Sequence, residues 1–253
     1  MPINFPRAVG IGSARPVTVG RWRLPDDLDA LNDHLEGRSA ADILSWARDA
    51  FGDGVVASSS FQTQSVPLLH LISTTTPDME VLFLDTGFHF PETLSFRDRL
   101  AAELAIRIRN LTAQQSRHGS SRGDLYHSDP DMCCYINKVE PLDRALAGKT
   151  AWVTGIRRDQ TSTRAEARIV GVRPDGVYKI APLLAWTDDD VSTYIRDHQL
   201  PEHPLTGLGY LSIGCAPCTR PVGAGEDARA GRWSGLDKTE CGIQDTDDPS
   251  GSS

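Results

Sequence analysis

The sequence predicts an α/β fold in which a mostly parallel sheet is flanked by helices. Short apolar runs of strand length alternate along the chain with segments of helix length, the pattern of βαβ units. At 253 residues, 39% hydrophobic and 24% charged, the chain has the composition of a globular protein with an ordinary core. In such a sheet ligands bind beyond the carboxyl ends of the strands, so functional residues are expected there.

The individual elements follow from apolar spacing and from capping residues. Strands are expected at 54–58, 79–84, 105–109 and 151–154. Helices are expected at 26–36, 39–51, 63–75, 91–104, 131–147 and 187–198. Ser39 and Thr187 are typical N-caps, whereas Pro141 is expected to break or kink the helix that contains it.

The chain is expected to have three parts. A loosely ordered arm at 1–25 is rich in Gly, Pro and Arg, one domain covers 26–233, and a mobile tail covers 234–253.

The net charge of −8 disfavours a nucleic-acid partner, although a local basic pocket for one small anion is compatible with it. No apolar run approaches the roughly 20 residues of a membrane span. The first residues lack a charged leader followed by an apolar segment, so we expect a cytoplasmic protein.

Five cysteines carry the most specific signal. They form an adjacent pair, Cys133 and Cys134, a C-x-x-C pair, Cys215 and Cys218, and the single Cys241. In a reducing compartment, clustered thiols bind metal or perform redox chemistry. Neighbouring side chains on a helix diverge by about 100°, which makes one tetrahedral zinc ion an awkward shared ligand. An iron–sulfur cluster is favoured because it offers separate irons to separate thiolates; zinc and a vicinal disulfide stay as alternatives.

Cys241 lies in the sequence KTECGI and has two interpretations. It is either a stray surface thiol or a nucleophile on a flexible segment. Lys238 favours the thiolate form and Gly242 provides backbone freedom, both of which suit a reactive cysteine. Composition alone leaves the choice open.

Polar loops follow three of the expected strands, at 58–62, 85–88 and 155–158, and are expected at one rim. The serine-rich first loop precedes a helix, which makes a cradle for an anion, but it lacks the Gly-Lys-Ser/Thr of a Walker loop. Arginines follow the fourth strand and recur before Cys241. Arginine suits phosphate and sulfate oxygens, although some of these side chains are expected to form only surface ion pairs.

Six segments, in this order and spacing, resemble the assimilatory sulfonucleotide reductases, specifically the bacterial iron–sulfur adenylyl-sulfate (APS) reductases. They are LDTGFHFPET, CCYINKVEPL, AWVTGIRRDQTSTRA, SIGCAPC, GRW and KTECGI. The resemblance extends from about Val55 to Ile243 and implies a PP-loop (adenine nucleotide alpha hydrolase-like) fold.

The resemblance also implies a reaction in two steps. Cys241 would attack the sulfur of APS, AMP would leave, and an S-sulfocysteine would remain. Reduced thioredoxin would then release sulfite. A [4Fe-4S] cluster would be bound by the other four cysteines: Cys133, Cys134, Cys215 and Cys218.

Further roles come from the same resemblance. The residues expected to bind the substrate are Ser58, Ser59, Ser60 and Gln62 in the phosphate loop, Asp85, Thr86 and Gly87 in a nucleotide-contacting turn, Arg157 or Arg164 together with Arg229 and Arg232 near the phosphosulfate, and Lys138 between cluster and substrate. Two positions depart from the family pattern: Gln244 replaces the usual histidine, and Asn137 replaces a basic residue in many relatives.

Three rival functions are weighed. Reduction of the 3′-phosphorylated substrate (PAPS) is disfavoured because its specific enzymes generally lack the four cluster cysteines. An adenylating PP-loop enzyme is disfavoured because the loop Ser-Gly-Gly-x-Asp-Ser is absent. A zinc-stabilised nucleotide-binding module is the non-enzymatic alternative. The sequence leaves a homo-oligomer open.

Overall fold

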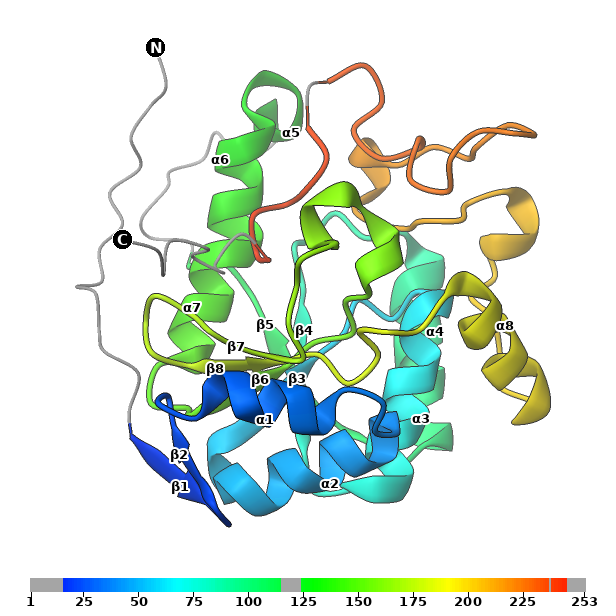
Figure 1. The fold of residues 1–253 in the computed structure, drawn as a ribbon. Coiled ribbons are helices and arrows are strands. Elements are labelled where there is room, and N and C mark those ends of the chain that lie inside the picture. The colour runs from blue at the N-terminus through cyan, green and yellow to red at the C-terminus, as the bar shows by residue number, and fades with distance from the viewer. Residues whose placement is uncertain (1–15, 115–123, 237, 245–253) are drawn as a thin grey trace.

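The computed structural model describes residues 16–114, 124–236 and 238–244, and its centre is a six-stranded sheet (Figure 1). The strands are β3 (Val55–Ser58), β4 (Glu80–Leu84), β5 (Arg107–Leu111), β6 (Ala151–Val153), β7 (Val170–Val172) and β8 (Tyr178–Ile180). Their order is β5-β4-β3-β6-β8-β7, and every neighbouring pair is parallel except β7 and β8. The predicted α/β fold with a mostly parallel sheet is confirmed.

Helices cover both faces of the sheet, because its strands are apolar on both faces. The helices are α1 (Leu28–Leu35), α2 (Ala40–Phe51), α3 (Val66–Thr75), α4 (Pro91–Glu103), α5 (Leu125–Ser128), α6 (Pro130–Cys134), α7 (Glu140–Leu146) and α8 (Asp188–Asp197). Val55 and Ala57 pack into the larger core with α1 to α4, whereas Val56 packs with α7 in a second core. This alternation along one strand is the two-residue period of β-structure.

The sequence analysis located the four parallel strands β3 to β6 but missed β7 and β8. Each of these two strands has only three residues, and a short polar turn joins them. Three residues are too few for a periodic pattern, and a hairpin lacks the helix-length spacer that marked the other strands. Both capping predictions are confirmed: Ser39 accepts a hydrogen bond from the Asp42 amide at 3.1 Å, and Thr187 accepts one from the Asp190 amide at 3.2 Å.

The prediction of a loosely ordered arm is wrong over part of its length. β1 (Val17–Val19) and β2 (Trp22–Leu24) form an antiparallel hairpin that turns at Gly20, whose φ is 55°. Leu24 is 2% exposed and belongs to the larger core, so the hairpin is held by burial of its own apolar residues. Residues 1–15 of the arm lie outside the described residues.

The helix expected at 131–147 is not broken at Pro141: the chain stays helical across the proline. A π-helical stretch, Tyr135–Val139, joins α6 to α7 just before the proline. In an α-helix the proline ring would collide with the carbonyl of residue 137, four residues earlier. The wider π turn accommodates the ring, so the chain stays helical from α6 to α7.

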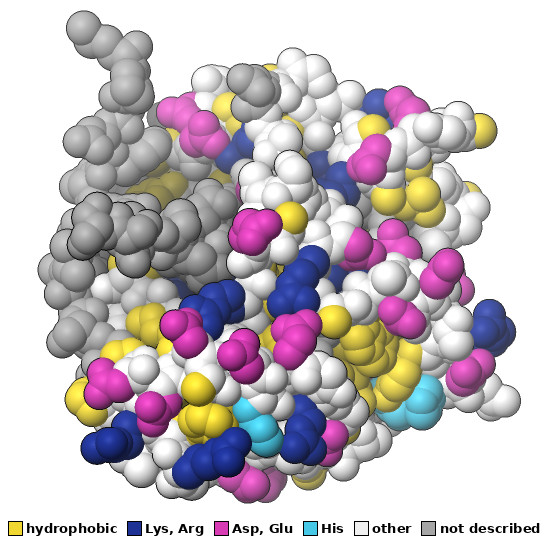
Figure 2. Space-filling view, viewed as in Figure 1, with side chains coloured by type: hydrophobic (Ala, Val, Ile, Leu, Met, Phe, Trp, Pro, Cys, Tyr) yellow, Lys and Arg dark blue, Asp and Glu magenta, His cyan; other side chains and the backbone are white. Residues whose placement is uncertain are grey.

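The visible surface carries charges of both signs. In the face shown in Figure 2, acidic and basic side chains are interspersed, so the described residues of this face form no continuous basic patch. None of the helices in the described part of the chain combines the length and the apolarity that crossing a bilayer requires.

His203 anchors the segment after α8 to the core. Its side chain is 1% exposed, its Nε2 lies 3.0 Å from Thr93 Oγ1, and its Nδ1 accepts a hydrogen bond from the Leu205 amide at 3.2 Å. Burial lowers the pKa of His203 to about 4. The ring is therefore neutral in the folded protein at neutral pH.

Acidification is expected to weaken the fold through His203. Because its pKa of about 4 in the folded state lies below the 6.5 of an unfolded histidine, the unfolded chain binds the extra proton. The contribution of neutral His203 to the free energy of unfolding is complete above about pH 6.5 and is lost as the pH falls from there toward 4. By pH 5 the free energy of unfolding is lower by about 2 kcal/mol. Urea unfolding at pH 7.5 and pH 5 measures this difference. His203→Gln should remove this part of the pH dependence, and an equal dependence in the variant would contradict the assignment.

Candidate active site

A pocket opens at the carboxyl ends of β3 and β6. From β3 the chain proceeds outward to β4 and β5, and β6 then joins the other side of β3, so the loops after β3 and β6 diverge at this point of the sheet. Such a switch point is where doubly wound sheets bind ligands. The pocket is partly open to solvent and is lined by the loops after both strands and by residues of the segment 240–244. Predicted site residues that line it after β3 are Ser58, Ser59, Ser60 and Gln62.

The serine loop after β3 is held in one conformation. Ser58 Oγ accepts a hydrogen bond from Trp152 Nε1 at 2.9 Å, and Ser59 Oγ accepts one from the Phe61 amide at 3.1 Å. Phe61 has a φ of 54°, an unfavourable value for an aromatic residue, and its buried ring packs edge-on against Phe83. The packed ring thus holds the strained turn that brings the serines to the pocket.

The turn after β4 contacts the loop that contains Cys215 and does not line the pocket. Thr86 Oγ1 lies 3.3 Å from Cys215 Sγ, and the Phe88 carbonyl accepts a hydrogen bond from the Ala216 amide at 2.7 Å. Asp85 caps the turn by accepting from the Gly87 amide at 3.1 Å. The structure therefore does not place Asp85, Thr86 and Gly87 among the residues that line the pocket, because their hydrogen bonds go to their own turn and to the loop of Cys215.

The four cysteines of the two pairs come together beside the pocket. Cys133 and Cys134 lie on α6, and Cys215 and Cys218 flank a single 3₁₀ turn. Burial and the neighbouring Cys215 raise the pKa of the Cys133 and Cys218 thiols, and burial raises the pKa of Cys134 to about 11.

All five cysteines are free, so Cys133 and Cys134 form no vicinal disulfide. Within the described ranges, no three or more His, Cys, Asp or Glu side chains are arranged to hold a single metal ion.

Lys138 lies between the cysteines and the pocket. Burial alone would lower its pKa, but the thiols of Cys215, Cys241 and Cys134 raise it above the usual lysine value. No described carboxylate pairs with it. Asn137, where the family pattern has a basic residue, donates hydrogen bonds from Nδ2 to Cys133, at 2.9 Å to the carbonyl and 3.6 Å to Sγ.

Positive charge dominates the pocket. Its charged lining residues are four cations, Lys138, Arg164, Arg229 and Arg232, and one carboxylate, Glu240. Burial lowers the pKa of Arg229, Glu240 opposes this, and Arg232 adds to it. In a protein of net charge −8, this gathering makes the pocket an anion site.

Arg232 reaches the pocket because residue 214 is glycine. A Cβ at Gly214 would overlap the Arg232 guanidinium, which stacks on the Trp233 ring 4.4 Å from its centre. No described carboxylate pairs with Arg232, and its Nε is buried without a hydrogen-bond partner in the described part of the chain. This guanidinium is thus available to an anionic ligand.

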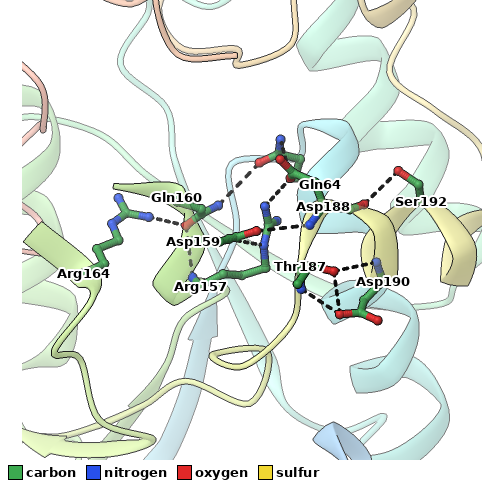
Figure 3. A network of polar contacts seen from close by, with 9 residues as sticks. All are labelled: Gln64, Arg157, Asp159, Gln160, Arg164, Thr187, Asp188, Asp190 and Ser192. Atoms are coloured by element: carbon green, nitrogen blue, oxygen red, sulfur yellow. Dashed lines mark hydrogen bonds and ion pairs between the residues drawn. The ribbon is translucent and has the colours of Figure 1, made fainter. Parts of the chain in front are cut away.

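Arg157 points away from the pocket, contrary to its expected place among the substrate contacts. Its side chain is 1% exposed and pairs with Asp159, at 3.0 Å, and with Asp188 at the start of α8 (Figure 3). Gln160 Oε1 accepts hydrogen bonds from the Arg157 amide, at 3.1 Å, and from the guanidinium of Arg164. Arg157 is therefore a structural residue of this loop, whereas Arg164 is the arginine that lines the pocket.

The segment 238–244 is seated in the pocket. It lies beside α6 (red in Figure 1), Lys238 pairs with Asp131, and Arg229 donates to the Thr239 carbonyl at 2.8 Å. Cys241 thereby lines the pocket. Residues 237 and 245–253 of the predicted mobile tail lie outside the described residues.

Gln244 holds the far end of this segment. Its Nε2 donates to Thr154 Oγ1 at 3.1 Å, and its carbonyl accepts from Lys179 Nζ at 3.2 Å. An amide at this position therefore fastens the segment to the loop after β6.

Two residues of the site escaped the sequence analysis. Glu240 pairs with Arg164 and Arg229, and Gln160 orients Arg164. Glu240 had a usable signal, since a carboxylate directly precedes the proposed nucleophile. Gln160 had none, because a glutamine in a polar loop is commonplace. His89 also lines the pocket and donates from Nε2 to the Leu84 carbonyl at 2.8 Å.

Comparison with known proteins gives a consistent result. The phosphoadenosine phosphosulfate reductase domain matches residues 54–221. An adenosine 5′-phosphosulfate reductase of Streptomyces coelicolor is 44% identical and covers 87% of this chain and 96% of its own length. One from Mesorhizobium japonicum is 46% identical and covers 85% of each.

Two solved structures align with this chain over most of its length. The phosphoadenylyl-sulfate (PAPS) reductase of Candida auris aligns with a TM-score of 0.66 at 29% identity, covering 81% of this chain and 98% of that one. The FMN adenylyltransferase of Candida glabrata, at a TM-score of 0.55 and 15% identity over 76% of this chain and 64% of its own, shares the fold alone.

The two arginines of the loop after β6 should differ in their effect on stability. Arg157→Ala is expected to lower the free energy of unfolding by about 3 kcal/mol, because it leaves a cavity and breaks a buried ion-pair network. Arg164→Ala should cost less than Arg157→Ala, because Glu240 keeps Arg229 as a partner. Urea unfolding followed by tryptophan fluorescence measures both, and equal losses would contradict the division of roles.

Proposed function

The chain belongs to the phosphoadenosine phosphosulfate reductase domain family, and on that premise we propose that it reduces adenosine 5′-phosphosulfate (APS) to sulfite and AMP. The predicted resemblance to sulfonucleotide reductases and the PP-loop fold are confirmed. The observation that carries the proposal is the position of Cys241 in a pocket lined by four cations. A nucleophilic sulfur and an oxyanion site are what capture of an activated sulfate requires.

Substrate binding is assigned to the cationic pocket. Lys138, Arg164, Arg229 and Arg232 neutralise the phosphosulfate, and the serines after β3 accept its phosphate end against the start of the following helix. Arg232 and Lys138 are free of carboxylate partners in the described part of the chain, so both are available without a competing ion pair.

In the first step the Cys241 thiolate attacks the sulfur of APS. A sulfur–sulfur bond forms, the bond from sulfur to the bridging oxygen breaks, and AMP leaves with the electron pair. The phosphoric–sulfuric anhydride makes AMP a good leaving group, and the surrounding cations stabilise the charge that develops on it. The product on the enzyme is an S-sulfocysteine.

In the second step a thiolate of reduced thioredoxin attacks Sγ of Cys241 and displaces sulfite. The second thioredoxin thiol then resolves the mixed disulfide, which returns the Cys241 thiol and leaves oxidised thioredoxin. The two electrons come from the thioredoxin dithiol, so the reducing cytoplasm is the expected compartment. Cys241 must leave the pocket for this step, and Gly242, at a φ of 85°, allows the segment to bend there.

Cys133, Cys134, Cys215 and Cys218 are assigned to a [4Fe-4S] cluster. Three of these thiols are buried and the fourth is half-buried, and Cys215 interacts electrostatically with the other three, so the two pairs lie near each other. Thiolates gathered in this way are the ligands that an iron–sulfur cluster takes. When bound, the cluster supplies a fixed charge of about −2 beside Lys138 and a covalent link between α6 and the loop of Cys215.

Cys241→Ser is expected to reduce sulfite release by at least about a thousandfold, since no hydroxyl replaces the thiolate. With APS and without thioredoxin, the wild-type chain should gain the mass of one sulfonate on the Cys241 peptide, and the variant none. Intact-mass and peptide-mass measurements report this, and a sulfonate on another cysteine would defeat the assignment.

Comparing kcat/KM for APS and PAPS in the same assay tests the PAPS alternative, which a preference for the 3′-phosphorylated nucleotide would support.

The metal content separates the cluster from the zinc alternative. Anaerobically purified protein should be brown and contain about four irons per chain. Cys218→Ser should lose colour and iron, whereas Cys241→Ser should keep both. Colourless protein with one zinc would favour the zinc-stabilised module instead.

A further inference from the structure

Glu240 is paired with two of the arginines that line the pocket. It is the one carboxylate that lines the pocket among the described residues, and it directly precedes Cys241. Its side chain is 11% exposed and lies 2.8 Å from Arg164 and 3.5 Å from Arg229. Two cations assigned to the substrate are therefore already paired.

Some donors of these arginines are committed, whereas Arg164 Nε has no hydrogen-bond partner in the described part of the chain. One terminal nitrogen of Arg164 donates to Gln160 and the other to Glu240. A terminal nitrogen of Arg229 faces both Glu240 and the Thr239 carbonyl, which it meets at 2.8 Å. A ligand oxyanion that approaches these two guanidiniums competes with Glu240 for their charge and for the nitrogens that the carboxylate faces.

Charge balance explains why the carboxylate is there. Burial lowers the pKa of Arg229, and Arg232 and Arg164 lower it further, whereas Glu240 raises it. Buried like charges without a counter-ion repel and are costly to desolvate. The Glu240 carboxylate offsets part of the positive charge of the pocket and at the same time holds the Cys241 segment there.

We propose that Glu240 is a positioning residue that stands in for the substrate anion: it holds the Cys241 segment in the pocket, and an incoming oxyanion competes with it for Arg164 and Arg229. This inference rests on the proposed function. Anion binding then loosens the contact that holds Cys241, while Gln244 keeps the far end of the segment attached to Thr154. The ion pair thus couples occupancy of the pocket to release of the reactive thiol.

The test measures accessibility of Cys241 in the full-length holoenzyme under anaerobic conditions. Alkylation by iodoacetamide is followed on the Cys241 peptide by mass, with inorganic sulfate as the probe and chloride at equal ionic strength as reference. Sulfate should accelerate alkylation of the wild type several-fold. Glu240→Gln should be alkylated rapidly without sulfate, and sulfate should add little.

The matched control is Glu226→Gln, which removes the same charge from an exposed ion pair with Arg220, at 2.8 Å, and lines no part of the pocket. It should behave as the wild type. If sulfate only screened the pocket cations, alkylation of the wild type would be unchanged or slower, and the proposal would fail.

The affinity for sulfate is a second readout. If Glu240 only supported the arginines, Glu240→Gln would weaken sulfate binding, whereas the proposal predicts tighter binding. Calorimetric titration with inorganic sulfate should give a Kd about three- to tenfold lower for Glu240→Gln than for the wild type. An unchanged or weaker affinity would show that Glu240 only orients the arginines. Failure of the wild type to acquire a sulfonate from APS, with the sulfate responses intact, would overturn the proposed function and leave this inference standing.

Discussion

The concentration of positive charge at one edge of the sheet is the constraint on which the rest of the site depends. Three guanidiniums and one ammonium line the pocket between the loops after β3 and β6. Their mutual repulsion has to be offset, and the surrounding structure supplies what is needed. Gln160 and the Arg157 network orient Arg164, Gly214 leaves room for Arg232, and Glu240 provides a counter-charge. The same features make the pocket suited to an anion, since Lys138 and Arg232 line it without a carboxylate partner among the described residues.

Lys138 is a cation of the pocket that interacts with the cysteines. The thiols of Cys134, Cys215 and Cys241 all act on Lys138, which therefore connects the proposed cluster to the proposed nucleophile. The π-helical stretch that follows Cys134 carries both Lys138 and Asn137. Pro141 thus has a consequence beyond local geometry: the wide turn that accommodates it sets where these two side chains lie relative to the cysteines.

The Cys241 segment meets the body of the protein at both ends. Gln244 bonds Thr154 through a neutral amide at one end, and Lys238 pairs with Asp131 at the other. Between them Glu240 pairs with Arg164 and Arg229, so the balance between Glu240 and an incoming anion rests on these two arginines.

The sequence by itself determined the parallel sheet, the rim loops and the grouping of the cysteines, because continuous apolar runs, capping residues and Cys spacing are local signals. The same reasoning missed β7 and β8, which are too short to be periodic, and the hairpin of β1 and β2, which exists because Leu24 is buried by distant residues. Only the tertiary structure decided that Arg164 faces the pocket while Arg157, seven residues earlier, pairs with Asp188, and that Glu240 lies between two arginines. The physical reason is that the direction of a charged side chain follows from the partner that lies nearest in space, and for Arg157 and Glu240 that partner is far away in the sequence.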